Sequence, residues 1–313
     1  MKKGHKIYKN AIQILIVLFG ISLLTFCLTY LSPGDPAEIM LTRAGVIPTP
    51  ELLAQTRAEL GVDKPFIQQY GKWLFSLLKG DLGNSYSLKT PVADKIRQAF
   101  MPTLNLSLLA MFFMIVISVP AGILSAVKVN KWQDYFIRMF TFVGISVPNF
   151  WLGLIFLSIF GVKLRWIPVA GGKTDFISMI LPAFTISLAM SSKYTRQIRS
   201  LFLDELSKNY VMRARIRGIK EKVILFRHVL PNAMLPLITL LGLSLGSLLG
   251  GTAVVEIIYN WPGMGSMAVK AISYKDYPLI QAYVLLTALI YMIITILVDF
   301  SYKYLDSRVQ EAL

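Results

Sequence analysis

The stretch Asn209–Asn232 reads NYVMRARIRGIKEKVILFRHVLPN, is strongly basic and lies between two long apolar runs. Its first part places Tyr210, Val211 and Ala214 at helical spacing, so it predicts a short amphipathic helix. Gly218 then interrupts the pattern, because glycine ends a helix at low cost in the left-handed conformation.

A second helical pattern follows the glycine. It places Ile219, Val223, Phe226 and Leu230 on one face, and Pro231 is predicted to end it. The whole stretch therefore predicts two short amphipathic helices about a glycine hinge, forming a surface that grips a partner. A solvated basic loop between membrane spans is the alternative, but such a loop has no use for apolar stripes.

The composition is that of a membrane protein rather than a soluble domain. The chain has 313 residues, 55% of them hydrophobic, and its mean hydropathy is +0.60. The net charge is +15, but the basic residues are divided among apolar runs and no stripe of base-stacking aromatics accompanies them. Anionic lipid and an acidic protein partner explain this charge better than nucleic acid does. A single cysteine, Cys27, excludes an intrachain disulfide.

Six apolar runs are each long enough to cross a bilayer, which takes about 20 residues in a helix. They cover residues 11–31, 103–127, 136–161, 178–198, 234–257 and 279–302. Lysine and arginine gather in the loops on one side, including the basic stretch, so the positive-inside rule places both termini in the cytoplasm. The chain is thus divided into three parts. Residues 1–101 form a first span with an extracytoplasmic helical insertion, and residues 102–302 form a five-helix core with a cytoplasmic loop at about 199–232. Residues 303–313 form a cytoplasmic tail.

The insertion, residues 32–101, contains helix signals of its own. Thr49 and Pro50 open a helix that Gly61 ends. A second helix begins after Pro65 and presents an aromatic and aliphatic face, which is expected to pack on the other spans rather than on the outer leaflet. A third helix is predicted from Thr90-Pro91 to Pro102.

The spans carry almost no ionisable residue, whereas secondary carriers usually need buried acids or histidines as ion relays. The energy for transport is therefore expected to come from elsewhere. The fifth span instead carries Gly242, Gly246 and Gly250, followed by Gly251. This bare face serves either close helix packing or a smooth pathway between subunits.

No catalytic or metal-binding motif is present in the sequence. GGKT at Gly171–Thr174 lacks the first glycine of a phosphate-binding loop, since residue 167 is Ile167. His5, His228 and Cys27 are too far apart in sequence to predict a metal site. No nucleophile with an adjacent base appears either, which disfavours an intramembrane hydrolase.

The basic stretch resembles the cytoplasmic coupling loop of ATP-binding-cassette (ABC) import permeases, whose pattern is Glu-Ala-Ala, then Gly, then Leu-Pro. Ala214, Gly218, Leu230 and Pro231 fit this pattern, whereas Met212 and Arg213 depart from its first two positions. The Tyr-Val start at Tyr210 and the ending with His228, Leu230 and Asn232 resemble the dipeptide/oligopeptide/nickel branch.

Further motifs of that branch follow in the same order along essentially the whole chain. They are Ser32–Pro36, Leu60–Pro65, Gly80–Gly83, Ser146–Trp151, Glu256–Gly265 and Asp276–Pro278. The sequences around Pro50 and Pro148–Trp151 are most similar to the nickel-permease B subunits.

The resemblance implies an all-α polytopic membrane protein with six transmembrane helices, the type I transmembrane domain of an ABC importer. It implies the cytoplasmic membrane as location and, as partners, a second permease subunit in a heterodimer, two cytoplasmic ATPases, an extracytoplasmic solute-binding protein and membrane lipid. ATP would be used by the partner subunits, and this chain would bind no cofactor and catalyse no reaction. The expected coupling residues are Tyr210, Ala214, Arg215, Gly218, His228, Leu230, Pro231 and Asn232, and Arg213, Arg215 and Arg217 would meet acidic residues or lipid.

The cargo that the resemblance implies is nickel, crossing as a small chelate because the spans offer no cluster of metal ligands. Import of di- or oligopeptides is the alternative within the same family. A secondary carrier is the alternative outside it.

Overall fold

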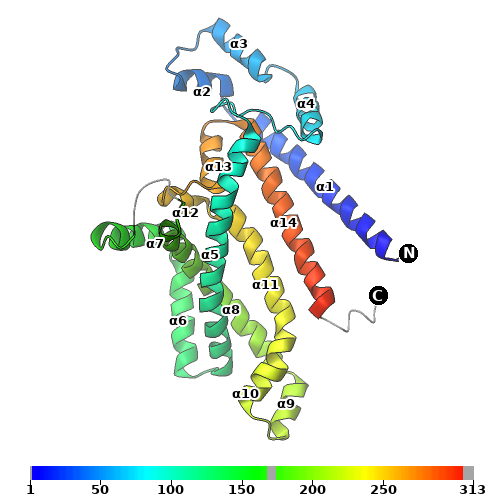
Figure 1. Cartoon of the computed structure of the whole chain (residues 1–313), viewed down its shortest axis with the longest axis vertical. Helices are drawn as coiled ribbons and strands as arrows, with labels where there is room; N and C mark the ends of the chain where they lie inside the picture. The colour runs from blue at the N-terminus through cyan, green and yellow to red at the C-terminus, as the bar shows by residue number, and fades with distance from the viewer. Residues whose placement is uncertain (1, 168–173, 306–313) are drawn as a thin grey trace. The chain divides into compact units, whose positions relative to one another are not determined.

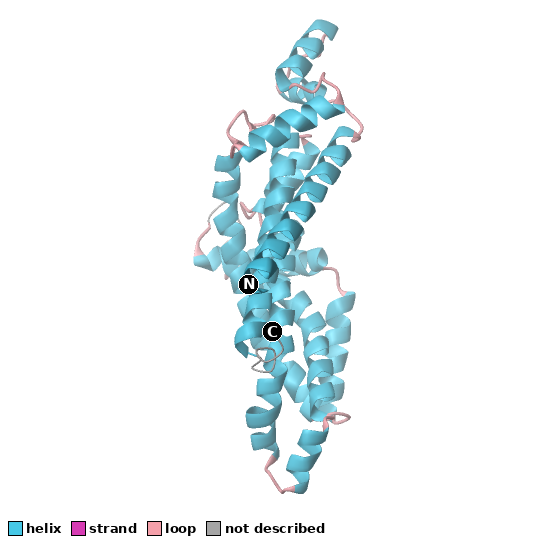
Figure 2. Cartoon of the chain, turned by 90° about the vertical axis from the view of Figure 1, so that its right-hand side faces the viewer, coloured by secondary structure: helices cyan, strands magenta, loops and turns pink. Residues whose placement is uncertain are grey.

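The computed structural model describes residues 2–167 and 174–305, which form helices joined by loops (Figure 2). The only β pairing among these residues is an isolated bridge between Asn84 and Pro91. Within these described residues, five helices are long and apolar enough to cross a membrane, and a bent pair, residues 132–163, makes six if it counts as one span. The prediction of an all-α membrane protein is confirmed.

The chain packs into two compact units. The first comprises residues up to 102 together with 262–292, and the second comprises 103–261 together with the residues from 293 on. Two long helices, α5 (Val92–Val127) and α14 (Tyr277–Leu305), contribute to both units.

The first unit contains α1 (Lys2–Tyr30), three short helices and α13 (Met264–Ser273), together with the first turns of α5 and α14 (Figure 1). The short helices are α2 (Pro36–Arg43), α3 (Pro50–Leu60) and α4 (Phe66–Leu78). As predicted, the Thr49 side chain caps α3 by accepting a hydrogen bond from the backbone N–H of Leu52, and Gly61 ends the helix with a φ of +70°.

The aromatic face of α4 packs on α1, as expected. Phe66 and Tyr70 lie edge-on to Phe26, with ring centroids 5.4 and 5.3 Å apart. Phe66 also meets Tyr30 at 5.2 Å, and the Tyr70 hydroxyl lies 2.9 Å from the Ser22 hydroxyl. Edge-to-face pairs of this kind add to the burial of apolar area, so the insertion is fixed on its own span.

The predicted third helix of the insertion is not a separate element. Residues 92–102 are the beginning of α5, which continues through Pro102. A proline inside a transmembrane helix removes one backbone hydrogen bond, and neighbouring groups in the membrane make up for it, so Pro102 does not end the helix.

The second unit holds the rest of α5, the bent pair, and a run of helices from α8 to α12, together with the end of α14 (Figure 1). These elements are α6 (Trp132–Ser146), α7 (Asn149–Phe156), the π-helical η1 (Leu157–Lys163), α8 (Phe176–Leu206), α9 (Asn209–Ile216), α10 (Glu221–Val223), the π-helical η2 (Ile224–Val229), α11 (Leu230–Gly251) and α12 (Ala253–Ile258).

Two predicted spans are broken in the structure. The span at 136–161 bends by 96° between α6 and α7, because Val147 precedes Pro148 and adopts an extended conformation. The span at 234–257 stops at Gly251, and a new short helix begins after Thr252. Glu256 in that helix is fully buried and accepts hydrogen bonds from the hydroxyls of Thr103 and Thr252, each at 2.8 Å. Thr252 at the break and Thr103 of α5 thus supply the donors that a buried carboxylate needs.

Candidate functional site

The first candidate site is the basic stretch between α8 and α11 in the second unit (Figure 1). Helix α9 lies on the body of this unit through Val211 and Ala214, both buried as the spacing predicted. These side chains share one core cluster with Ile198 and Phe202 of α8 and with Ala126 at the end of α5. Helix α9 is therefore packed directly on two long helices.

Gly218 ends α9 as the sequence predicts, with a φ of +73°. Its N–H donates to the carbonyl of Arg215 at 2.9 Å, and the N–H of Ile219 donates to the carbonyl of Ala214 at 3.2 Å. This pair of bonds is a Schellman motif, which requires the left-handed residue. Ile219 and Ala214 belong to the same apolar cluster, so the turn is also anchored by packing.

The helix after Gly218 differs from its prediction. The predicted apolar face is only half right. Ile219 and Leu230 pack against the core cluster, but Val223 and Phe226 are exposed, and the fully buried residues are Ile224 and Val229. These two lie five positions apart, the spacing of the π-helical segment η2, whereas the prediction assumed an α-helix.

Pro231 does not end this helix either. It is the second residue of α11, which follows η2 without a break. Pro231 removes one backbone donor from this continuous helix, and the π turn before it is a local adjustment that accommodates the interruption.

A polar network joins the two ends of the stretch. The Tyr210 hydroxyl donates to one oxygen of buried Glu205 at 2.8 Å, and the ammonium of Lys208 binds the other oxygen at 2.7 Å. The Asn232 side chain donates to the carbonyl of His228 at 2.6 Å and lies near enough to the Tyr210 hydroxyl to lower its pKa. Burial and Glu205 raise the pKa of Tyr210 to about 12, so the hydroxyl remains a donor.

The structure thus brings Tyr210, His228 and Asn232 together, three of the residues that the sequence singled out. It adds Glu205, which lies before the stretch and gave no signal in the sequence. From sequence alone, a single glutamate such as Glu205 in a basic loop is interpreted as a solvated charge, and only the fold shows that it is buried.

The opposite face of α9 exposes apolar side chains with basic residues around them. Met212 is 63% exposed and Ile216 is 80% exposed, one turn apart. No salt bridge involves Arg213 or Arg217 among the described residues. Arg215 instead pairs with Glu221 through two hydrogen bonds, at 2.7 and 3.2 Å, across the Gly218 turn. Arg215 is thus paired within the chain, and the expected contacts of the arginines with acidic residues of a partner or with lipid stay a prediction.

The glycines of α11 have different surroundings. A Cβ on Gly242 would lie 2.3 Å from a methyl group of Val298 on α14, so this glycine allows two helices of the second unit to approach closely. A Cβ on Gly250 would meet nothing within 4 Å, and Gly250 is exposed whereas Gly246 is half-buried. Close packing thus accounts for Gly242, and the pathway role of this face stays a prediction.

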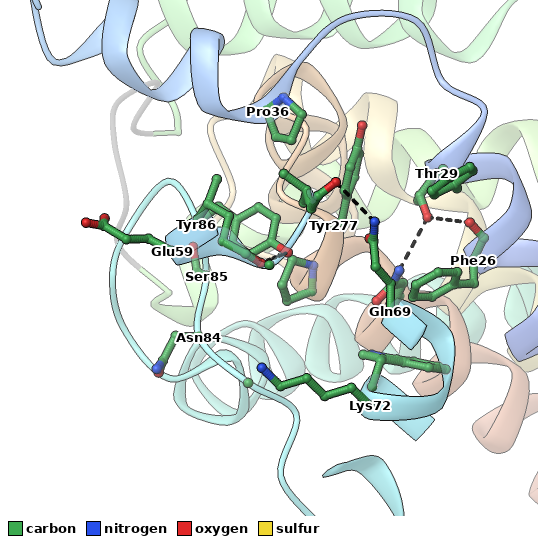
Figure 3. A pocket seen from close by; sticks show the side chains of 18 of the residues that line it. Phe26, Thr29, Pro36, Glu59, Gln69, Lys72, Asn84, Ser85, Tyr86 and Tyr277 are labelled. Atoms are coloured by element: carbon green, nitrogen blue, oxygen red, sulfur yellow. Dashed lines mark hydrogen bonds between the residues drawn. The ribbon is translucent and has the colours of Figure 1, made fainter. Parts of the chain in front are cut away.

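The first unit contains a second candidate site, a cavity of about 720 Å³. Aromatic side chains, among them Phe26, Trp73 and Tyr86, line it together with the amide side chains of Gln69 and Asn84. Figure 3 shows the Lys72 side chain extending along the cavity toward Asn84, and Glu59 at another edge.

One wall of this cavity is held by a buried carboxylate. Asp276 accepts hydrogen bonds from the hydroxyl groups of Ser85 and Ser87 and from the backbone N–H groups of Tyr86 and Ser87. The turn between α13 and α14 thereby fixes the loop before α5, within the first unit. Burial, followed by the charge of Asp276, raises the pKa of Tyr86 to about 12.

Metal ligands do not gather at either site. Within residues 2–167 and 174–305, no group of three or more His, Cys, Asp or Glu side chains is placed to hold a metal ion.

Two protein-family models match the chain and together cover most of its length. Residues 118–311 match the family described as binding-protein-dependent transport system inner membrane component. Residues 5–107 match its N-terminal companion family.

Relatives and solved structures agree with this. The glutathione transport system permease protein GsiC of Escherichia coli is 36% identical over 304 residues, covering 97% of this chain and 98% of the relative. The protein of the same name from Shigella boydii is 35% identical over the same coverage. A chain from an inward-facing crystal structure of the MetNI methionine ABC transporter superposes with a TM-score of 0.55 at 17% identity, covering 68% of this chain and 96% of that one. This last likeness concerns the fold alone.

Proposed function

Because the chain belongs to the family of binding-protein-dependent transport system inner membrane components, the permease subunits of ABC importers, we propose that it forms part of the passage for small peptides. The observation that carries this proposal is the 36% identity to a glutathione permease over 97% of the chain. Glutathione is a tripeptide, so the comparisons favour the peptide alternative of the sequence analysis over its first choice, a nickel chelate. Family membership also removes the secondary carrier as an alternative.

The cavity of the first unit supports a peptide cargo. Its wall combines aromatic faces, the ammonium of Lys72, the carboxylate of Glu59 and the amide group of Asn84. A short peptide carries an ammonium, a carboxylate and amide groups of its own, so this lining complements a zwitterionic solute better than a bare cation.

The proposed assembly follows from the family. A second permease subunit completes the passage, two cytoplasmic ATPases supply energy, and an extracytoplasmic binding protein delivers the cargo. The chain lies in the cytoplasmic membrane, with both termini and the stretch at 199–232 on the cytoplasmic side.

The proposed mechanism places α9 in a groove of one ATPase. Its exposed side chains Met212 and Ile216 fill apolar space, while Arg213 and Arg217 meet acidic residues of the partner. When the ATPases close on ATP, they push α9, and the buried contacts of Val211 and Ala214 move α8 and the end of α5. The passage then changes between outward-facing and inward-facing states.

Uptake measurements test the proposed cargo. A strain deleted for this gene is given labelled glutathione, a labelled dipeptide and radioactive nickel, with and without the wild-type gene on a plasmid. We expect peptide uptake to be lost on deletion and restored by the plasmid, with nickel uptake unchanged. Loss of nickel uptake with intact peptide uptake would overturn the proposal.

A further inference from the structure

A cavity of about 640 Å³ lies between α6 and α8 in the second unit. Ser125 at the end of α5 and the buried hydroxyl residues Thr141 and Thr195 lie in its wall. The remaining lining divides into a basic group, Arg138, Arg196 and Arg199, and an apolar group that includes Met139, Phe142 and Ile145.

The register of the two helices places the basic group at one end of the cavity. Arg199 of α8 binds Asp134 of α6 through two hydrogen bonds of 2.8 Å each. Further along the antiparallel pair, a Cβ on Gly144 would lie 2.0 Å from the Ser192 hydroxyl oxygen, so the helices touch there. Arg138 and Arg196 fall between these two contacts, toward the Asp134 end.

Two of the three guanidinium groups are available to a ligand. Arg199 is already neutralised, because its partner Asp134 is fully buried and also accepts a hydrogen bond from Ser125. Arg138 and Arg196 are exposed and take part in no salt bridge among the described residues; Arg138 lies 5.8 Å from the centre of the Tyr135 ring. An unpaired guanidinium beside a membrane span is stabilised by an anion.

The side chains of the apolar group are large and yet exposed. Phe142 is 75% exposed and Met139 is 61% exposed, on the same helix as Arg138. Free inorganic phosphate would satisfy the arginines and leave these side chains without a partner. An amphiphile with an anionic head and an apolar tail satisfies both groups at once.

We propose that this cavity binds an anionic phospholipid. Arg138 and Arg196 hold the phosphate, the hydroxyls of Thr141 and Thr195 lie beside the glycerol, and one acyl chain runs along Phe142 and Ile145. Basic pockets between transmembrane helices take lipid headgroups for this reason. The Arg199–Asp134 pair keeps the two helices together and so preserves the shape of the site.

Lipid retention tests the proposal. The purified transporter, with all its subunits, is stripped of lipid in detergent and incubated with dioleoyl-phosphatidylglycerol and dioleoyl-phosphatidylcholine in equal amounts. Bound lipid is then measured by mass spectrometry. The variant Arg138→Gln/Arg196→Gln is compared with Lys131→Gln/Lys193→Gln, which removes two positive charges from the start of α6 and from α8 but none from the lining of the cavity.

We expect the wild type and the lysine variant to retain phosphatidylglycerol in preference to phosphatidylcholine. The arginine variant should retain at least about tenfold less phosphatidylglycerol, since each basic residue near anionic lipid contributes to binding. Equal retention of the two lipids by the wild type, or an equal loss in both variants, would overturn the proposal. So would displacement of the lipid by millimolar inorganic phosphate, which would indicate a site for the free anion.

A second measurement does not depend on how well the variants fold. Wild-type transporter is irradiated with phosphatidylglycerol that carries a photoreactive group next to the phosphate. Crosslinks to residues 135–145, competed by phosphatidylglycerol and not by phosphatidylcholine, support the site. Crosslinks that avoid this segment contradict it and would indicate that a partner subunit covers the cavity.

Discussion

At the scale of single residues, Gly218 forms the turn that ends α9, and in the proposed mechanism this turn sets how α9 meets the ATPase. A valine there would be held at a φ of +73°, which costs an L-residue roughly 1–2 kcal/mol, although no atom lies within 4 Å of the added Cβ. We expect Gly218→Val to reach the membrane in normal amount but to lose peptide uptake and copurification with the ATPase, because the Schellman turn is distorted. Membrane fractionation, uptake and affinity purification measure the three effects.

Asparagine is the matched control for this substitution, since it tolerates the left-handed conformation. Gly218→Asn should keep most of the uptake and of the ATPase association. Full uptake by the valine variant at normal expression would show that the stretch does not couple transport to the ATPases.

Tyr210 gives a prediction about pH. Its folded pKa is raised from 10 to about 12, so the unfolded chain loses the proton first as the pH rises. The hydroxyl therefore contributes its full stabilisation below pH 10 and loses it between pH 10 and about 12. Tyr210→Phe should melt at a lower temperature than the wild type at pH 8, because the bond to the Glu205 carboxylate, worth about 1.5 kcal/mol, is missing.

The difference in melting temperature between the two proteins should shrink as the pH passes from 10 to 12. Fluorescence-detected melting in detergent over pH 8–12 measures it. A difference that stays constant with pH would mean that the hydroxyl does not hold the α8–α9 corner.

At the scale of elements, the glycine face of α11 serves packing at one position and is open at another. Gly242→Ala places a methyl group 2.3 Å from the branched and therefore stiff side chain of Val298, and such overpacking costs about 1–3 kcal/mol. Gly250→Ala fills open space on the same helix and should not lower the melting temperature, since alanine favours a helix more than glycine does.

Removing the obstacle should rescue the first variant. Adding Gly242→Ala to the Val298→Ala variant should lower the melting temperature less than adding Gly242→Ala to the wild type. If Gly250→Ala keeps the wild-type melting temperature but slows uptake, the open part of the face lines the passage. Unchanged uptake by Gly250→Ala would contradict the pathway role.

The elements show which features local sequence can predict. The Thr49 cap and the turn at Gly218 were predictable because their causes lie within a few residues of each other. The break at Pro148 was missed, since one span was predicted at 136–161, and its 96° bend also depends on how α6 and α7 pack on α8. The π-helical η2 was missed since the prediction assumed 3.6 residues per turn.

In the candidate site, too, features with local causes were predictable and features that depend on packing were not. Val211, Ala214 and the exposed arginines follow from periodicity, and the structure places them as expected. The burial of Glu205 and Asp276 could not be predicted from periodicity, because burial of a carboxylate depends on partners that only the fold assembles. For Asp276 these partners are the serines of a loop about 190 residues away in the chain.

At the scale of the whole molecule, the distribution of basic residues predicts how the chain lies in the membrane. The short segments that carry Lys128, Lys131 and the arginines of the 199–217 region are expected in the cytoplasm, and the insertion at 32–101 is expected outside. Coupling to cytoplasmic ATPases and delivery of cargo from outside both require this orientation.

Two single cysteines in a Cys27→Ala background test it. Ile67 on α4 is 81% exposed, and Ser207 at the end of α8 is exposed as well. In whole cells, a membrane-impermeant maleimide should label Ile67→Cys and spare Ser207→Cys, because only the first lies outside the permeability barrier. Opening the cells should make Ser207→Cys react, which shows that its thiol is accessible. Labelling of Ser207→Cys alone in intact cells would mean that the chain is inverted, and the proposed contact between α9 and a cytoplasmic ATPase would then fail with it.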